Sequence, residues 1–290
     1  MHYEPNTTDH GLPHDPFKSC VVPRPIGWIS TLSVDGAANL APFSQFQNLS
    51  FNPPYVMFSA NESDGAGGRG GRKDSVVNAE NTGAFVWNMA IYDLREAVNI
   101  SARDFPPDVD EFAEAGVTKA DSLLVKPPRV AESPVHFECE YYSTLRLPGL
   151  GANGAGAADM VIGRVKMIHI ADDAFDADGK LDIPRLKPIA RLGYYDYTMV
   201  ETVFEMIIPG AGESMLKGLE GQTAGPKKRP NNSICGPSGI RVRDRCAFPP
   251  RWANGPTSAA AARTCGYSAS LAIRCSSCPC LFWSACLCHC

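Results

Sequence analysis

Three consecutive residues, Lys73, Asp74 and Ser75, place a cation, a carboxylate and a hydroxyl at the start of a predicted helix, 73–81. The first turn of a helix has backbone N–H groups without partners inside the helix, and these groups attract anions. A lysine and a hydroxyl beside them would add a charge and a donor, so the triplet indicates a phosphate-binding site. The alternative is a solvated surface helix that Asp74 or Ser75 caps.

A second group of polar residues interrupts two apolar segments near the N-terminus, PRPIGWISTL and NLAPFSQFQNLS. Its members are Ser30, Thr31, Asn39, Ser44 and Asn48. Buried strands favour β-branched and aromatic residues. These polar side chains therefore either face water at the edge of a sheet or face a bound polar group.

Common catalytic and nucleotide-binding motifs are missing or misplaced. Gly149–Gly154 has the G-x-G-x-x-G spacing, but the segment that follows, 160–170, reads as a strand. A dinucleotide site needs a helix there, so a hairpin loop is favoured. The Gly-rich stretch 65–71 lacks the lysine of a P-loop, and neither G-x-S-x-G nor H-E-x-x-H occurs. His10 and His14 lie in a Pro-rich arm where no helix is expected, and we predict no metal site.

The elements that must position these residues are mostly short strands. Asp35-Gly36 favours a hairpin turn between the first two of them. Many short strands with few helices predict a mostly β fold, a small antiparallel barrel with peripheral helices. The expected strands are 24–33, 38–46, 54–60, 83–90, 135–147, 160–170 and 199–208, and the expected helices are 73–81, 92–103 and 108–115.

The segment 135–147 alternates with a period of two. Val135 and Phe137 point to one side, whereas His136 and Glu138 point to the other. This alternation predicts a long strand with one buried face. His136 and His169 are accordingly expected to be ordinary surface or interface residues.

Composition divides the chain into unlike parts. Of 290 residues, 44% are hydrophobic and the net charge is −4, which suits one sizeable domain and gives no indication of nucleic-acid binding. No apolar run suggests a membrane span, and the polar N-terminus suggests no secretory signal. Nine of the 11 cysteines follow residue 225, where basic residues also gather. We predict an irregular arm (1–15), a cytoplasmic barrel domain (16–210) and a disordered tail (211–290) whose cysteines have no matched zinc-knuckle spacing.

Taken in order, three segments resemble the flavin reductase-like, FMN-binding split-barrel family. They are PRPIGWISTLSVDG, NLAPFSQFQNLSFNPPYVMFSA and RKDSVVNAENTGAFVWNMA. The resemblance covers about residues 16–207, and the order of the motifs is more specific than any one of them. It implies an FMN-binding split barrel.

The resemblance also implies which residues contact FMN. Lys73-Asp74-Ser75 corresponds to the family's Lys-Asp-Thr phosphate element, and Tyr194 replaces a family glycine after Arg191. The small polar strand residues would face the flavin, which is one answer to why they interrupt the strands. The implied contacts are Ser30 and Thr31 beside the isoalloxazine and ribityl chain; Asn39, Ala41, Pro42 and Ser44 beneath the ring; Asn48 and Ser50 in the same wall; Lys73, Asp74 and Ser75 at the phosphate; and Arg191 near the ring.

The function implied is that of an FMN-dependent oxidoreductase with NADH or NADPH as a transient hydride donor. Family members are typically homodimers with the flavin near the subunit interface. The flavin carries the hydride chemistry, so no catalytic side chain is required. Two alternatives remain open: a non-catalytic FMN-binding module that acts as a sensor or carrier, and an unrelated barrel without flavin.

Overall fold

The computed structural model describes residues 1–64, 70–106, 109–151, 155–210 and 212. By its internal contacts the chain divides into two units, Met1–Leu219 and Glu220–Cys290. The fold below is that of the first unit. The second unit lies outside the described residues, together with nearly all of the predicted tail, so disorder of the tail stays a prediction. Residues 1–15 contain turns and bends but no helix or strand.

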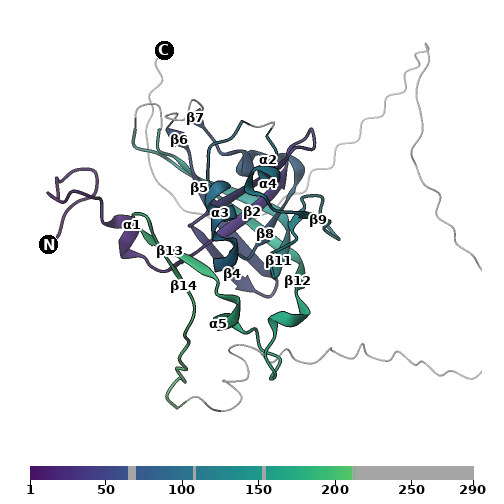
Figure 1. Ribbon diagram of the computed structural model, residues 1–290. Coiled ribbons are helices and arrows are strands. Elements are labelled where there is room, and N and C mark those ends of the chain that lie inside the picture. Colours follow the sequence, from purple (N-terminus) through teal and green to yellow (C-terminus); the bar gives the residue numbers. More distant parts are fainter. Residues whose placement is uncertain (65–69, 107–108, 152–154, 211, 213–290) are drawn as a thin grey trace, which may run out of the picture. The chain divides into compact units, whose positions relative to one another are not determined.

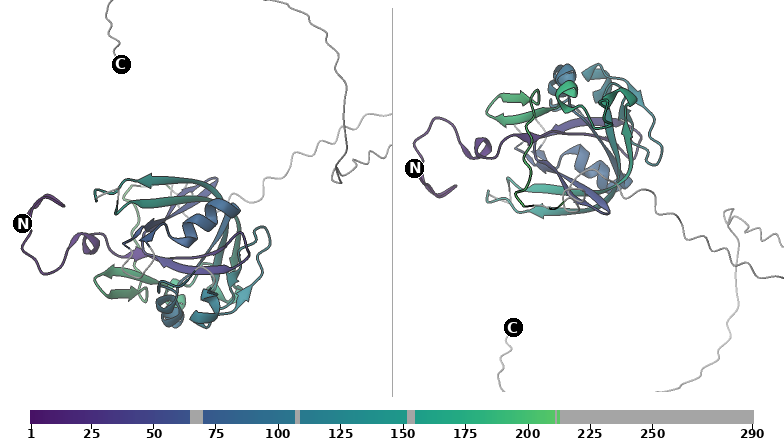
Figure 2. Two further views of the ribbon diagram at one scale, coloured as in Figure 1. Left: turned by 90° about the horizontal axis from the view of Figure 1, so that it is seen from above. Right: turned by 90° about the horizontal axis from the view of Figure 1, so that it is seen from below.

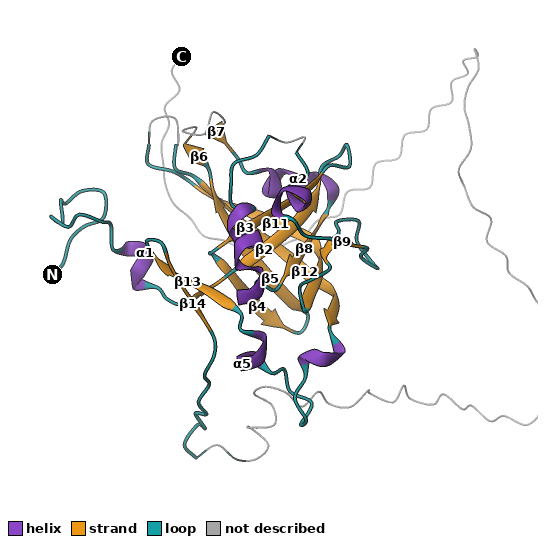
Figure 3. Ribbon diagram, in the orientation of Figure 1, coloured by secondary structure: helices purple, strands orange, loops and turns teal. Residues whose placement is uncertain are grey.

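Short strands and a few short helices make up the described part of the chain (Figures 1 and 3). The strands are β1 (Arg24–Pro25), β2 (Gly27–Leu32), β3 (Ala38–Phe43), β4 (Phe46–Phe51), β5 (Pro54–Asn61), β6 (Ser63–Asp64), β7 (Gly70–Gly71), β8 (Ala84–Asn88), β9 (Lys119–Ala120), β10 (Arg129–Val130), β11 (Val135–Leu147), β12 (Ala158–Ile170), β13 (Ile189–Gly193) and β14 (Asp196–Met199). The helices are α1 (Phe17–Cys20), α2 (Asp74–Thr82), α3 (Arg95–Ile100), α4 (Glu111–Ala115) and α5 (Ile183–Leu186), with 3₁₀ turns η1 (Tyr92–Leu94) and η3 (Asp172–Ala174).

The main sheet has seven strands in the order β3-β2-β8-β11-β12-β5-β4, and every neighbouring pair is antiparallel. The sheet curves into a barrel, and α2 lies across one end of it (Figures 1 and 2). The predicted mostly β antiparallel fold with peripheral helices is confirmed.

The longest pair of strands, β11 and β12, forms a hairpin in which Leu147 is opposite Ala158. The G-x-G-x-x-G stretch therefore falls between two paired strands, although part of it lies outside the described residues, and the strand predicted after it is confirmed. Gly163 on β12 lies against the ring of Phe85. A Cβ atom at this glycine would come within 2.4 Å of that ring, so only glycine fits at this crossing.

Two clusters of buried side chains stabilise the two faces of β2, because residues on this strand alternate between them. The first core includes Ile29, and α2 contributes Val76 to it. The second core includes Trp28, against which Val98 of α3 and Phe112 of α4 pack. Both faces of β2 are thus removed from water, which is why a strand containing Ser30 and Thr31 is almost completely buried.

Two expectations about strands are wrong. The apolar segment 199–208 is not a strand, because β14 ends at Met199 and residues 200–208 pair with no other strand in the described part of the chain. The segment 38–46 is not one strand either. Ser44 and Gln45 separate β3 from β4, and these two strands lie at opposite ends of the strand order.

The expectation of one buried face for β11 is also wrong, and His136 is not a surface residue. His136 is 4% exposed and Glu138 is 0% exposed. The segment before β10 covers this second face, and the Glu138 carboxylate accepts hydrogen bonds from the backbone N–H groups of Leu123, Leu124 and Val125. It also pairs with His169 Nε2 at 2.6 Å.

Acid should destabilise the fold through His136. Its Nε2 atom lies 2.8 Å from the Val130 carbonyl oxygen, whereas Nδ1 is buried without a hydrogen-bond partner among the described residues. A second proton would go onto this isolated atom, and burial lowers the pKa of His136 to about 4. The unfolded chain binds that proton near its ordinary pKa of about 6.5. His136 therefore has little effect on the free energy of unfolding above pH 6.5. As the pH falls from 6.5 toward 4, that free energy decreases by about 2–3 kcal/mol.

Urea denaturation of the wild type and of His136→Gln across this pH range measures the effect. Glutamine has no ionisable group, so the variant should lose less stability than the wild type between pH 6.5 and 4. Equal losses in both proteins would contradict the assignment.

Candidate functional site

A small cavity of about 90 Å³ lies at the start of α2. Strand β3, the first turn of α2, the segment after α3 and α4 surround it, and these are far apart in the sequence. The cavity brings together six of the predicted site residues: Asn39, Ala41, Pro42, Lys73, Asp74 and Ser75. The remaining lining residues are Phe43, Ser101, Ala102, Arg103, Asp104, Phe105 and Glu111.

The helix start at the cavity differs in detail from the prediction. Lys73, not Asp74 or Ser75, occupies the N-cap position, with extended backbone and no capping bond from its side chain. Its carbonyl oxygen accepts hydrogen bonds from the N–H groups of Val76 and Val77, as the first turn of a helix requires. The Lys73 ammonium lies 3.8 Å from Asp104 Oδ1, and both side chains are more than 30% exposed.

Asn39 is the centre of the polar network at this cavity. Its Oδ1 atom accepts a hydrogen bond from Ser75 Oγ at 2.7 Å, and Thr31 Oγ1 also donates to it at 3.3 Å. Its Nδ2 atom donates to Glu111 Oε2 at 2.7 Å. Because both ends of the amide are held, the Ser75 hydroxyl has a fixed position beside the cavity.

Glu111 is the site residue that sequence reasoning missed. It is 6% exposed, and besides Asn39 it accepts a hydrogen bond from the backbone N–H of Leu40. Local pattern gives no indication of this role, because Glu114 in the same short helix is exposed. Only the packing of α4 against β3 distinguishes the two carboxylates.

The cavity carries charges of both signs. Lys73 and Arg103 are cationic, whereas Asp74, Asp104 and Glu111 are acidic. The pairing of Lys73 with Asp104 is long and exposed, and such pairs contribute little to stability. Lys73 is therefore not held in a strong ion pair, and the first turn of α2 places backbone N–H groups beside it.

Arg72, the residue before this triplet, does not point to the cavity. Its guanidinium donates to both carboxylate oxygens of Glu80 and to Asp159 Oδ2 at 2.7 Å. The Asp159 side chain is nearly inaccessible, and Arg146 binds it from the other side. Hydrogen bonds to Glu80 and Asp159 raise the pKa of Arg72, so this arginine stays charged as the central member of an ion-pair network.

Ser30 and Thr31 are not on the surface of the cavity. Both are 0% exposed. Ser30 Oγ donates to the Pro128 carbonyl oxygen, and Thr31 accepts a hydrogen bond from Asn78 Nδ2 at 3.2 Å. Protein groups thus satisfy the two hydroxyls, and Thr31 reaches the cavity only through Asn39.

Four other predicted residues lie away from the cavity. Ser44 connects β3 to β4 and is half-buried. On β4, Asn48 is exposed and bonds to Gln47, whereas Ser50 Oγ donates to the Pro53 carbonyl oxygen. Arg191 on β13 stacks on the ring of Tyr197 at 4.6 Å. Flavin contacts at these positions stay predictions.

The described residues contain no group of three or more His, Cys, Asp or Glu side chains that could hold a metal ion. Within the same residues, no helix is both long and apolar enough to span a membrane.

Comparisons with known proteins give the family and the fold. The flavin reductase like domain matches residues 19–202. An uncharacterized protein of Aquifex aeolicus is 37% identical over 177 residues, which are 60% of this chain and 84% of the relative. Nitrilotriacetate monooxygenase component B from Bacillus cereus has a similar structure, with a TM-score of 0.63 and 28% identity over 71% of this chain and 98% of that one. A Shewanella frigidimarina protein with a split barrel domain has a TM-score of 0.58 and 20% identity over 72% and 99% of the two chains, which identifies the predicted split barrel.

Proposed function

The chain belongs to the flavin reductase like domain family, and from this premise we propose that it is an FMN-binding oxidoreductase that uses NADH or NADPH. The observation that carries the proposal is the cavity at the start of α2. It combines a helix N-terminus, an exposed lysine and a positioned serine hydroxyl, which is the donor set that a phosphate monoester requires.

The donors fit the phosphate of FMN and leave the ring outside the cavity. A volume of about 90 Å³ accommodates a phosphoryl group but not three fused rings. We propose that Lys73 and Ser75 bind the phosphate and that Asp74 shapes the turn without touching the anion. The half-buried Ala41 and Pro42 then support the flavin along β3.

The residues around the phosphate act by positioning. Glu111 holds the Asn39 amide, and Asn39 holds Ser75, so removal of the carboxylate would release the serine. The Ser75 oxygen would stay where this network holds it, and only its hydrogen would turn from Asn39 Oδ1 toward a bound phosphate. Bound FMN supplies the hydride and electron transfer, whereas this chain binds and orients it.

Two measurements test the proposal. Purified protein should show flavin absorbance, and anaerobic mixing with NADH or NADPH should bleach it. Similarity to a monooxygenase component supports this redox role. A colourless protein that takes up no added FMN would contradict flavin binding. A yellow protein that neither nicotinamide bleaches would favour the carrier or sensor alternative.

We also propose that the protein is a cytoplasmic homodimer. Support for the dimer comes from large apolar side chains that a single chain leaves in water, including Phe51, Phe204 and Met206, all more than 75% exposed. Surfaces of this kind are commonly covered by a partner. Sedimentation of the FMN-loaded protein as a monomer at micromolar concentration would contradict the dimer.

A further inference from the structure

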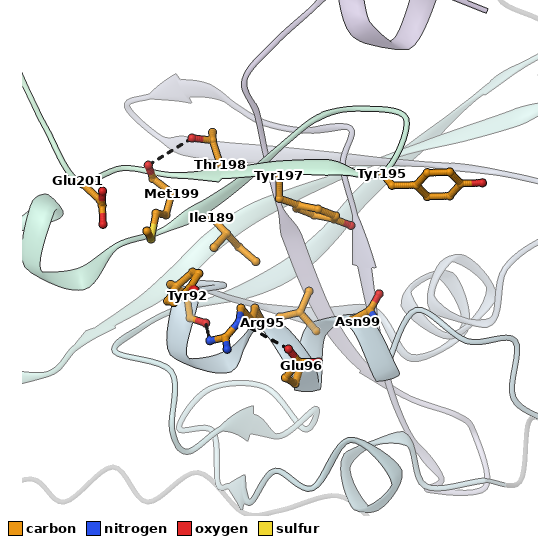
Figure 4. A pocket seen from close by; sticks show the side chains of 11 residues that line it. Tyr92, Arg95, Glu96, Asn99, Ile189, Tyr195, Tyr197, Thr198, Met199 and Glu201 are labelled. Carbon is orange, nitrogen blue, oxygen red and sulfur yellow. Dashed lines mark hydrogen bonds and ion pairs between the residues drawn. The ribbon is translucent and has the colours of Figure 1, made fainter. Parts of the chain in front are cut away.

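A second and larger pocket, of about 510 Å³, lies between the η1–α3 segment and the β13–β14 hairpin (Figure 4). It shares no lining residue with the cavity at α2, and its size is typical of small-molecule sites. The pocket is lined by Tyr92, Arg95, Glu96, Val98, Asn99, Ile189, Tyr195, Tyr197, Thr198, Met199 and Glu201.

Three of its eleven lining residues are tyrosines. Tyr92 comes from η1, whereas Tyr195 and Tyr197 come from the hairpin that faces it (Figure 4). The Tyr195 side chain is 93% exposed, so nearly all of its ring surface is available. Ile189 and Met199 add apolar surface between the tyrosines.

The backbone of the hairpin turn is strained. Tyr194 has a φ of 47°, a left-handed conformation that glycine adopts readily and a bulky residue avoids. Strain of this kind persists where the surrounding structure enforces it, and it is found disproportionately at ligand sites. Tyr195, the next residue in this turn, is one of the lining residues.

Each charged side chain of the pocket lies near a side chain of opposite charge. Arg95 lies 4.2 Å from the centre of the Tyr92 ring and 3.6 Å from Glu96. Glu201 lies 3.8 Å from the ammonium of Lys187. Because Lys187, outside the lining, balances Glu201, the pocket offers little net attraction to a charged ligand. Asn99 and Thr198 supply hydrogen-bonding groups at its edge.

We propose that this pocket binds an uncharged planar aromatic or heteroaromatic ring that has a polar edge. The ring stacks against the tyrosines, and its polar edge reaches Asn99 or Thr198. A planar ring can stack on the flat faces of the tyrosine rings, and this stacking adds stabilisation to that of apolar burial. The proposal rests on the pocket and not on the flavin assignment.

Benzamide, nicotinamide and cyclohexanecarboxamide test it by calorimetric titration of the full-length protein. The three share a neutral carboxamide and differ in the ring. Benzamide or nicotinamide should bind at least tenfold more tightly than the saturated compound. If both aromatic amides bind, the pocket accepts aromatic rings in general, and if only nicotinamide binds, it selects a heteroaromatic ring. Equal affinity for benzamide, nicotinamide and cyclohexanecarboxamide, or no binding of any, overturns the proposal.

Variants assign the binding to this pocket. Tyr195→Ala should weaken aromatic binding by about tenfold, whereas Tyr195→Phe should keep it, because the ring remains. Tyr142→Ala is the matched control, since that tyrosine is 64% exposed on β11 outside the pocket. If Tyr195→Ala abolishes self-association without altering ring binding, the face is an interface between copies and the proposal is wrong.

Discussion

Replacement of Lys73 by alanine is expected to weaken FMN binding by about tenfold to hundredfold and to leave riboflavin binding nearly unchanged. Charge-assisted hydrogen bonds contribute about 1.5–3 kcal/mol each, and a tenfold change in affinity corresponds to about 1.4 kcal/mol. Riboflavin lacks the phosphate, so it loses no such bond. Fluorescence quenching of each flavin by the variant and by the wild type measures both affinities.

The control for this experiment is Lys166→Ala. Lys166 lies on β12 beside Glu140, so its removal changes the net charge equally without touching the cavity. Arg72→Ala is a poorer control, because that arginine binds Glu80 and Asp159 and its loss would disturb the fold. If FMN and riboflavin weaken equally in Lys73→Ala, or if neither weakens, the phosphate is bound elsewhere.

The second large effect concerns Glu138. Glu138→Ala is expected to lower the free energy of unfolding by about 3–5 kcal/mol, because the N–H groups of Leu123, Leu124 and Val125 would lose their acceptor. Burial acts to raise the pKa of Glu138, but hydrogen bonds from Leu123, His169 and Leu124 outweigh it and hold the pKa below its ordinary value. The carboxylate therefore contributes stability at neutral pH and loses it only as acid protonates it in the folded state.

Urea denaturation at neutral pH, with Glu140→Ala beside it, provides the measurement. Glu140 is two residues further along the same strand but is exposed, where it pairs with Arg164 and Lys166. Its removal should cost much less free energy of unfolding than removal of Glu138, because exposed ion pairs are screened by water. Similar losses in the two variants would mean that the buried carboxylate does not hold the covering segment in place.

The sequence predicted those elements that neighbouring residues determine. The β11–β12 hairpin follows from alternation on both sides of a Gly-rich connection, and the start of α2 follows from its triplet. Burial of His136 and Glu138 did not follow, because the segment that covers them contributes nothing to the pattern of β11. The apolar residues after Met199 resemble a strand, yet no neighbouring strand pairs with them in the described part of the chain.

The candidate site was likewise predictable only where neighbouring residues determine it. The cavity unites β3 and α2 as the resemblance implied, but Ser30 is satisfied by the carbonyl oxygen of Pro128, 98 residues away. A hydroxyl in a strand looks the same in sequence whether a ligand or a distant loop is its partner. Glu111 was missed for a related reason, since its partner Asn39 lies 72 residues before it.

The chain just before Lys73 is held in place, and this determines where the domain can accept an insertion. Ser63 pairs with Gly71 and Asp64 with Gly70, and Arg72 is then bound to Asp159 on another strand. Any chain placed between residues 64 and 70 therefore leaves and re-enters the domain at fixed points. Each doubling of such a loop costs only about 0.6 kcal/mol in closure entropy. Insertions, including an engineered affinity tag, can thus accumulate at this position while Lys73 keeps its place.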